Sequence, residues 1–539
     1  MQTKILSEFT NLLNTASSFP YQAKSKKSKS LYSSLHSQNQ TQSSRFPFSR
    51  DASPSKTYIS KNFSTTSSIK DLICLKTMAR SSSFGGRNFN KTKTDFKKKS
   101  EELFRNLEFT DLTKLKRKSE TIHGVKLDLL LDLYEAKCKD NKTNLISEQA
   151  ILFLENFRKT SKRRKFMLGE LNLGVDSAKI LLNLLKDGRK SESVKKQKQN
   201  DYVIDQITSE GSINEEEDNY EDEIDFVTHL DLHQNNISDV GIEILSPILS
   251  TQVSLISIDV SSNSITDPGL NIIVRILSKN QSIISVNLSN KLGLNRNRFS
   301  FSAFEKLFLF LPNTSTLQFL NLESLYLSKE GLKSLELGIS NNISLISLNI
   351  SNTGLTSQCG KILGGIMINS RLQEIFISEN KLSDSGVRKM IEPLKGKVKN
   401  LVLKRIHGVE MSVSGLGFIS FLKTLVGSRD LEFIDWSRNC FRGRIFADIS
   451  SFLLENKSLK ELKLNSCDID WEGGRGIGDG LAKNKYLKKI GLNGNSLGSE
   501  GAKGLGEGLV ENNCLKWLDV SDCKIGDAGN KRILHLYKI

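Results

Sequence analysis

One pattern of apolar and polar positions recurs eleven times between residues 227 and 539: apolar-x-x-apolar-x-apolar-x-x-Asn-x-apolar. The copies that begin at Val227 (VTHLDLHQNNI) and Leu487 (LKKIGLNGNSL) show it clearly. The apolar-x-apolar alternation predicts a short strand, because successive side chains of a strand point to opposite faces. Apolar residues at helical spacing follow, as at Ile242, Leu245 and Leu249, so each copy predicts a strand and then a helix.

The first apolar positions of the copies set the repeat period, which is 28 residues between most neighbours. Two copies are longer, and their extra residues 290–299 and 404–415 are expected to loop out at the end of the strand. The first apolar positions are Val227, Leu255, Ile283, Leu317, Leu345, Leu372, Val398, Leu431, Leu459, Leu487 and Leu515.

This signature resembles the leucine-rich repeat, and its long period resembles the ribonuclease-inhibitor-like subfamily, which pairs each strand with a full helix. The resemblance implies that the Asn eight residues after the first apolar position, such as Asn235, satisfies backbone groups of neighbouring turns. Apart from the two longer copies, four copies hold another residue at this position: Leu325, Thr353, Cys467 and Cys523. Cys and Thr are usual substitutes in the family, whereas Leu is not.

The expected fold class is α/β, a curved leucine-rich-repeat solenoid with parallel strands on the concave face and helices on the convex face. Strands stack about 4.8 Å apart, whereas packed helices need about 8–10 Å. A strand layer and a helix layer of equal repeat number therefore force a bend. A helical cap and a disordered N-terminal tail are expected to precede the array.

Composition shifts divide the chain into five segments. We expect residues 1–95 to be a disordered, basic, Ser-rich tail and residues 96–165 a helical N-terminal cap. Residues 166–190 are a truncated first repeat, with Leu168-x-x-Leu171-x-Leu173 as its strand and Ser177–Lys186 as its helix. Residues 191–225 are a charged flexible insertion, and residues 226–539 hold the main array. Met78 is an alternative start of the mature chain.

The net charge of +17 is concentrated in the tail, since residues 1–100 hold 18 Lys and Arg against 4 Asp and Glu. The repeat array has only a mild basic excess, so nucleic-acid binding by the array is not expected. Residues 210–225 hold nine acidic residues in sixteen positions. This acidic segment is a solvated linker, or it competes with a basic partner or folds back on the basic tail.

Catalytic motifs are missing from the sequence. It contains no H-E-x-x-H or G-x-x-x-x-G-K-[ST] run. The Gly-rich runs 473–478 and 501–508 are expected to be positions where neighbouring helices approach closely, and not phosphate-binding loops. His229 and His233 flank Asp231 but give weak evidence for a metal. We therefore expect no enzyme activity, no cofactor and no metal.

The seven Cys are scattered and form no C-x-x-C pair, which favours a reducing compartment. No run of 18 apolar residues is present, so no membrane association is expected. We predict a cytoplasmic, monomeric protein, with the cytoskeleton or cilium as a narrower location and the nucleus as an alternative. A mitochondrial location is disfavoured because no Arg precedes Arg45.

The outward positions of each expected strand predict the binding surface. In the copy at Val398 these positions are Asn400 and Val402. Interface energy concentrates on aromatic and Arg side chains, so these residue types are the first candidates. The candidate binding residues are Phe319, Phe376, Phe433, Trp517, Asp231, Asp259, Asp435, Arg438, Arg442 and Arg444.

The leading hypothesis for function is a non-catalytic protein-interaction scaffold that binds a protein partner on the concave face, in a cytoskeletal or axonemal setting in its narrower form. One alternative is a small-GTPase regulator that resembles the Ran GTPase-activating proteins. In those proteins an acidic tail follows the repeats, whereas here the acidic run precedes them. The other alternative is polyanion or nucleic-acid binding through the basic tail.

Overall fold

The computed structural model describes residues 121–162, 164–186, 227–291, 293, 295–441 and 446–527. The chain divides into two units, Met1–Lys99 and Ser100–Ile539. All described residues belong to the second unit. The predicted tail 1–95 and the predicted insertion 191–225 lie outside the described residues.

The described part of the chain contains a twelve-stranded parallel sheet whose strands follow one another in chain order. Each strand is three residues long and pairs in register with the strands of the neighbouring repeats. Its strands are β3 (Lys165–Met167), β4 (His229–Asp231), β5 (Ser257–Asp259), β6 (Ser285–Asn287), β7 (Phe319–Asn321), β8 (Ser347–Asn349), β9 (Glu374–Phe376), β10 (Arg405–His407), β11 (Phe433–Asp435), β12 (Glu461–Lys463), β13 (Lys489–Gly491) and β14 (Trp517–Asp519).

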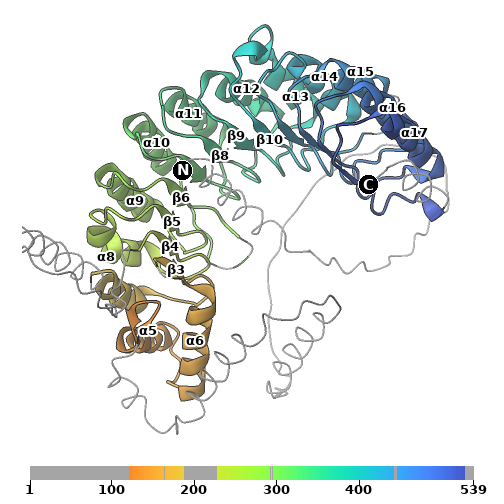
Figure 1. The fold of residues 1–539 in the computed structure, drawn as a ribbon. Coiled ribbons are helices and arrows are strands. Elements are labelled where there is room, and N and C mark those ends of the chain that lie inside the picture. Colours follow the sequence, from red (N-terminus) through yellow and green to blue (C-terminus); the bar gives the residue numbers. More distant parts are fainter. Residues whose placement is uncertain are drawn as a thin grey trace, which may run out of the picture. The chain divides into compact units, whose positions relative to one another are not determined.

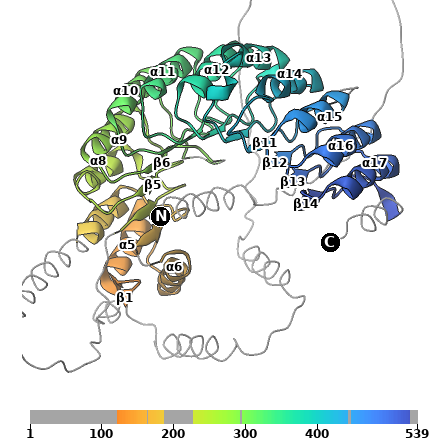
Figure 2. The same cartoon turned by 45° about the horizontal axis from the view of Figure 1, so that its top comes forward.

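A helix follows each strand from β4 to β13, so this unit is an α/β solenoid, as the sequence predicts. The strands line the inner side of the arc and the helices its outer side (Figures 1 and 2). None of the helices in the described ranges is long and apolar enough to span a membrane. The helices are α8 (Ser238–Leu249), α9 (Asp267–Lys279), α10 (Phe301–Phe310), α11 (Lys329–Ser340), α12 (Gly360–Asn369), α13 (Ser383–Ile391), α14 (Gly415–Leu425), α15 (Phe446–Glu455), α16 (Trp471–Lys483) and α17 (Gly498–Glu511).

The N-terminal flank of the sheet is covered by a hairpin of β1 (Thr121–Ile122) and β2 (Val125–Lys126), then by α5 (Leu127–Asp140) and α6 (Ser147–Thr160). Their apolar residues continue the core of the repeats. Asp140 anchors this block, because its carboxylate accepts hydrogen bonds from the backbone N–H groups of Gly174, Asp176 and Ser177 at 2.7–3.0 Å. Asp140 thus caps, from another element, the helix that spans residues 175–186.

Two strand predictions were wrong in register. The first repeat forms its strand at Lys165–Met167, before the predicted Leu168, because Phe166 pairs with Leu230 of β4. In the seventh repeat the strand is Arg405–His407, and the first apolar position is therefore Leu403 instead of Val398. The extra residues of that repeat precede the strand and include a 3-10 turn at Val398–Asn400.

The other long repeat follows the prediction, since its extra residues leave the end of β6. Asn297, at the far end of this loop, takes over the role of the repeat Asn. Its amide donates to the carbonyl oxygens of Val260 and Leu288 at 3.0 Å. Its oxygen accepts from the N–H groups of Asn263 and Ile265 at 2.9 and 3.0 Å.

A ladder of buried Asn side chains joins the turns that follow the strands. Asn439 shows the pattern: its amide donates to the carbonyls of Gly408 and Trp436 at 2.9 Å. Its oxygen accepts from the N–H groups of Met411 and Val413 at 2.9 and 3.2 Å. Each such Asn satisfies backbone groups of its own turn and of the preceding one, which apolar side chains cannot do.

The residues that replace this Asn satisfy fewer groups. Cys467 donates to the carbonyl of Trp436 at 3.3 Å, and burial raises the pKa of its thiol to about 12, so the proton stays in place. Thr353 donates to the carbonyl of Ile350 at 2.7 Å. Leu325 is buried and brings no polar group, so its side chain forms none of these hydrogen bonds.

Helices α16 and α17 pack through their glycines. A Cβ on Gly478 would overlap the carbonyl oxygen of Gly504, and a Cβ on Gly508 would overlap the carbonyl oxygen of Gly478. Gly474 likewise faces the Cα of Gly501. The prediction that these Gly-rich runs let neighbouring helices approach closely is therefore confirmed.

Candidate functional site

Five side chains on adjacent strands form a cluster on the concave face: Glu374, Phe376, Arg405, His407 and Phe433. They come from β9, β10 and β11, and the parallel register decides which of them meet. Arg405 lies opposite both Glu374 and Phe433, and His407 lies opposite Phe376. We call these five residues the central cluster.

The central cluster is held by hydrogen bonds and stacked rings. Arg405 Nε lies 2.8 Å from Glu374 Oε1, and His407 Nε2 lies 3.1 Å from the same oxygen. The His407 ring stacks on Phe376 at 4.0 Å between centroids with an interplanar angle of 15°. The Arg405 guanidinium lies 3.9 Å from the centroid of the Phe433 ring, within the range of a cation–π contact.

Burial and charge set the protonation of this cluster. Burial lowers the pKa of His407 below its ordinary value, and the hydrogen bond to Glu374 offsets this only in part. Burial alone would raise the pKa of Glu374, but the bonds and charges of its His407 and Arg405 partners lower it. We therefore read His407 as neutral, with its Nε2–H donating to an ionised Glu374, and Arg405 as the cation.

The predicted aromatic residues are not equally exposed, and two predictions of exposure were wrong. Phe433 is only 2% exposed and Phe319 only 8%. Long side chains from neighbouring strands cover Phe433, because Arg405 lies over its ring and the Lys463 ammonium lies 5.3 Å from its centroid. Phe376 is half-buried, and Trp517 is 43% exposed.

Arg405 and His407 were missed by the sequence reasoning. The apolar pattern that begins at Val398 predicts Asn400 and Val402 at the outward positions of this strand. They precede β10 instead. The spacing of 28 residues from Leu403 to Leu431 was the available signal.

The predicted charged residues fall into separate places. Arg438 lies on the exposed rim and pairs with Glu410 at 2.5 Å. The Asp435 carboxylate accepts a hydrogen bond from the N–H of Ser437 at 3.0 Å. Arg442 and Arg444 lie outside the described residues. The central cluster thus contains two of the ten predicted binding residues, Phe376 and Phe433.

Asp231 at the end of β4, His233 just beyond it and Asp259 at the end of β5 form a second polar group. Their possible ligand atoms lie within 4.8 Å of one another. Among the described residues, this is the group whose side chains are close enough together to hold a metal ion. Asp231 accepts from Nδ1 of His233 at 2.6 Å, and Asp259 accepts from Ser261 and from Asn287. Burial and then the charge of Asp231 raise the pKa of Asp259.

The two partly buried histidines, His233 and His407, are expected to give opposite pH dependences of stability. Burial lowers the pKa of His233, but the hydrogen bond and charge of Asp231 outweigh it, so the net shift is upward. Its stabilising contribution is full below the unfolded pKa of about 6.5 and is lost as the pH rises through the folded pKa. For His407 the folded pKa is depressed, so stability falls as the pH drops below about 6.5.

We therefore expect His407→Gln to reduce the loss of stability on acidification, and His233→Gln to cost more stability at low pH than at high pH. Urea unfolding of both variants and the parent at about pH 5.5 and about pH 8 measures this. If the stability of the two variants changed with pH in the same direction relative to the parent, the opposite pKa shifts of His233 and His407 would be contradicted.

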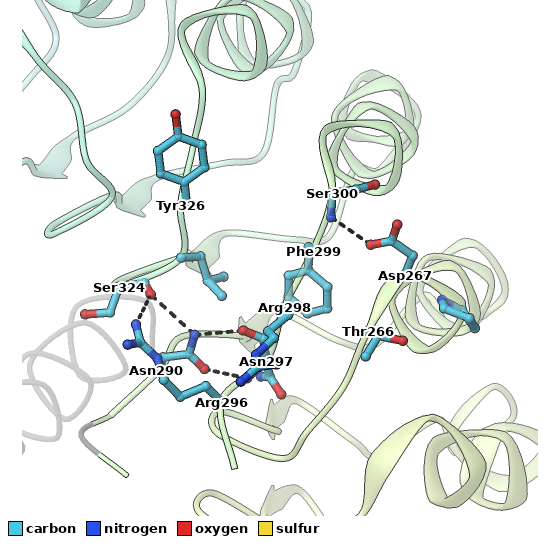
Figure 3. Close-up of a pocket in the computed structure, with 12 residues that line it drawn as sticks. Thr266, Asp267, Asn290, Arg296, Asn297, Arg298, Phe299, Ser300, Ser324 and Tyr326 are labelled. Atoms are coloured by element: carbon cyan, nitrogen blue, oxygen red, sulfur yellow. Dashed lines mark hydrogen bonds between the residues drawn. The ribbon is translucent and has the colours of Figure 1, made fainter. Parts of the chain in front are cut away.

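A pocket of about 720 Å³ opens where the loop of the third repeat leaves the sheet (Figure 3). Asn290 and Asn297 fix this loop, because the Asn290 amide donates to the Asn297 carbonyl and its oxygen accepts the Asn297 N–H. Arg296 donates to the Ser324 carbonyl at 3.1 Å. Leu325, which stands at the Asn position of its own repeat, also lines the pocket.

Comparison with known proteins identifies the repeat. Residues 226–246, 252–271, 455–478, 483–506 and 511–533 match a family model described as "Leucine Rich repeat". The matches lie at both ends of the array. Comparison with curated proteins gives no significant match.

Among solved structures, an internalin from Listeria monocytogenes is similar at 15% identity and a TM-score of 0.36, over 80% of this chain and 98% of that one. A chain of the Rad7 and Elc1 complex of yeast matches at 15% identity and a TM-score of 0.39, over 57% and 73%. The leucine-rich-repeat-containing protein LegL7 from Legionella pneumophila matches at 15% identity and 0.35, over 55% and 93%. These likenesses concern the fold and carry no inference about partners.

Proposed function

We propose that this chain, which contains leucine-rich repeats, is a non-catalytic scaffold that binds a protein partner on the concave face of strands β9–β14. The observation that carries the proposal is the run of charged and aromatic side chains across these adjacent strands. It begins at Glu374 and ends at the exposed Trp517. Solenoids use such concave surfaces for binding, because each repeat adds one strand to a continuous wall.

The central cluster supplies a rigid base for this surface. Glu374, Arg405 and His407 hold one another through hydrogen bonds of 2.8 and 3.1 Å, and the stacked rings limit their rotation. Side chains that are already ordered lose little conformational entropy when a partner binds. The arrangement therefore favours recognition of a preformed surface.

The same packing argues against catalysis by His407. Its ring lies between Phe376 and Phe433, with centroid distances of 4.0 and 4.7 Å. Its Nε2 is engaged with Glu374, and only 13% of the side chain is exposed. A general base must reach the proton that it abstracts, and this ring offers a substrate little access.

Trp517 is the expected anchor of the interface. It is 43% exposed and stands at the first position of β14. Exposed Trp side chains contribute strongly to interface energy when a partner buries them. Trp471 provides a matched control, because it is 50% exposed but lies at the start of α16, away from the strands.

We expect Trp517→Ala to reduce the recovery of bound protein in quantitative affinity capture from native lysate at least about tenfold, which corresponds to about 1.4 kcal/mol. Trp471→Ala should leave the recovery within about twofold of the parent. Equal losses in the two variants, or no loss in either, would show that the concave face of β14 is not the binding surface.

A further inference from the structure

We infer that one edge of the last three repeats binds an acidic, aromatic-containing peptide segment of a protein partner. The inference rests on the proposed scaffold function and names the chemistry of the partner. The surface consists of Lys485, Lys488, Lys489, Lys516, Tyr486 and Trp517, and we call it the lysine edge.

The repeat places lysines side by side at the start of consecutive strands. Lys460, Lys488 and Lys516 each occupy the residue just before β12, β13 and β14. The N–H of Lys488 donates to the carbonyl of Lys460 at 2.7 Å, and the N–H of Lys516 donates to that of Lys488 at 2.7 Å. Neighbouring strands are about 4.8 Å apart, so these lysines form a row.

Part of this positive charge is unpaired. Lys460 lies 2.5 Å from Glu432, and Lys489 lies 3.6 Å from Glu461. By contrast, Lys485, Lys488 and Lys516 form no ion pair with any residue in the described ranges. The carboxylates of a partner could therefore form ion pairs with these three lysines without displacing an ion pair within the described residues.

Exposed aromatic rings stand among these lysines. Tyr486 is 42% exposed and Trp517 is 43% exposed. Tyr486 lies between Lys485 and Lys488 in the sequence, and Trp517 follows Lys516 directly. Rings beside ammonium groups suit a peptide in which carboxylates alternate with aromatic or apolar side chains.

The opposite edge of the same repeats is acidic, and this charge favours a peptide over a nucleic acid as the ligand of the lysine edge. The segments that follow the ends of β12, β13 and β14 carry one basic residue, Lys524, against six acidic ones: Asp468, Asp470, Glu472, Glu500, Asp522 and Asp527. A phosphate backbone that crossed the concave face would meet this acidic edge as well as the lysine edge. A short acidic segment can stay on the lysine edge alone, so charge complementarity favours a peptide.

The test measures binding of a fluorescein-labelled 12-residue peptide of Glu and Asp with one central Phe to the full chain by anisotropy. A peptide with Gln and Asn in place of the acids and a 12-nucleotide single-stranded DNA are the comparison probes. We expect the acidic peptide to bind more tightly than either comparison probe. We also expect its affinity to fall as the salt concentration is raised.

The variant Lys488→Glu/Lys516→Glu is expected to weaken binding of the acidic peptide at least tenfold. The control Lys333→Glu/Lys361→Glu makes the same charge change at exposed positions of α11 and α12 and should leave binding within about twofold. Thermal unfolding of both variants verifies that they fold. Trp517→Ala should also weaken binding of the peptide. Charge attraction alone would not predict this effect.

Equal effects of the two double variants, or tighter binding of the DNA, would overturn the inference. Binding of the peptide only after the nine acids of residues 210–225 are replaced by Gln and Asn would overturn it in favour of this segment of the chain itself as the occupant. If Trp517→Ala abolishes capture of a partner while the lysine variants leave it intact, the scaffold function stands and only the acidic-peptide inference falls.

Discussion

Asn439→Ala is expected to lower the free energy of unfolding by about 3–6 kcal/mol. The change removes four hydrogen bonds of 2.9–3.2 Å between the side chain and buried backbone groups. Two N–H groups and two carbonyls then lose this partner, and an unsatisfied buried group costs about 1–3 kcal/mol. The loss exceeds that of an ordinary surface substitution because water cannot replace the side chain at a position that is 5% exposed.

Urea unfolding followed by circular dichroism measures this effect. Asn369→Ala is the matched control, since Asn369 is exposed at the end of α12 and should change stability by no more than about 0.5 kcal/mol. A loss below about 1 kcal/mol for Asn439→Ala would mean that the buried Asn is not a principal support of the array.

Gly508→Ala is expected to destabilise the C-terminal repeats by about 1–3 kcal/mol, although Ala is the better helix former. Intrinsic helix propensity alone predicts a gain of about 1 kcal/mol. The new Cβ would overlap the carbonyl oxygen of Gly478 on the neighbouring helix, so α16 and α17 must separate and lose contact. Packing therefore reverses the sign that propensity predicts, and Gly508→Leu should cost more.

Hydrogen exchange measured by mass spectrometry separates local from global effects. Each repeat contacts mainly its neighbours, so faster exchange should be confined to α16, α17 and the adjacent strands. Gly427→Ala is the control, because no atom lies within 4 Å of a Cβ built there. A stabilised Gly508→Ala variant, or uniform acceleration across the array, would contradict the close helix packing.

The alternation of strands and helices could be predicted from the sequence because it is a local property. Leu230 and Leu232 must share one face of a strand, and the apolar residues of α8 must share one face of a helix. The buried Asn residues could also be placed, since Asn235 and Asn495 stand at fixed positions in their copies. These positions can be predicted from the periodicity of the sequence alone, because they do not depend on how neighbouring repeats pack.

The central cluster could not be predicted in full, because it depends on contacts between repeats. The register of β10 is fixed by its pairing with β9 and β11, whereas the sequence around Val398 offers a second apolar pattern of similar quality. That ambiguity removed Arg405 and His407 from the candidate residues. An error of five residues at one strand changes which side chains face Glu374 and Phe433.

The sequence by itself determined that this chain builds a sheet of short parallel strands backed by helices, because burial of regularly spaced apolar residues admits one repeating solution. Only the tertiary structure decided which outward side chains remain accessible. Phe433 and Trp517 occupy equivalent positions in their strands, yet the first is 2% exposed and the second 43%. The physical reason is that strands about 4.8 Å apart place Arg405 and Lys463 over Phe433, whereas Trp517 lies on the last described strand of the sheet and keeps nearly half of its surface in water.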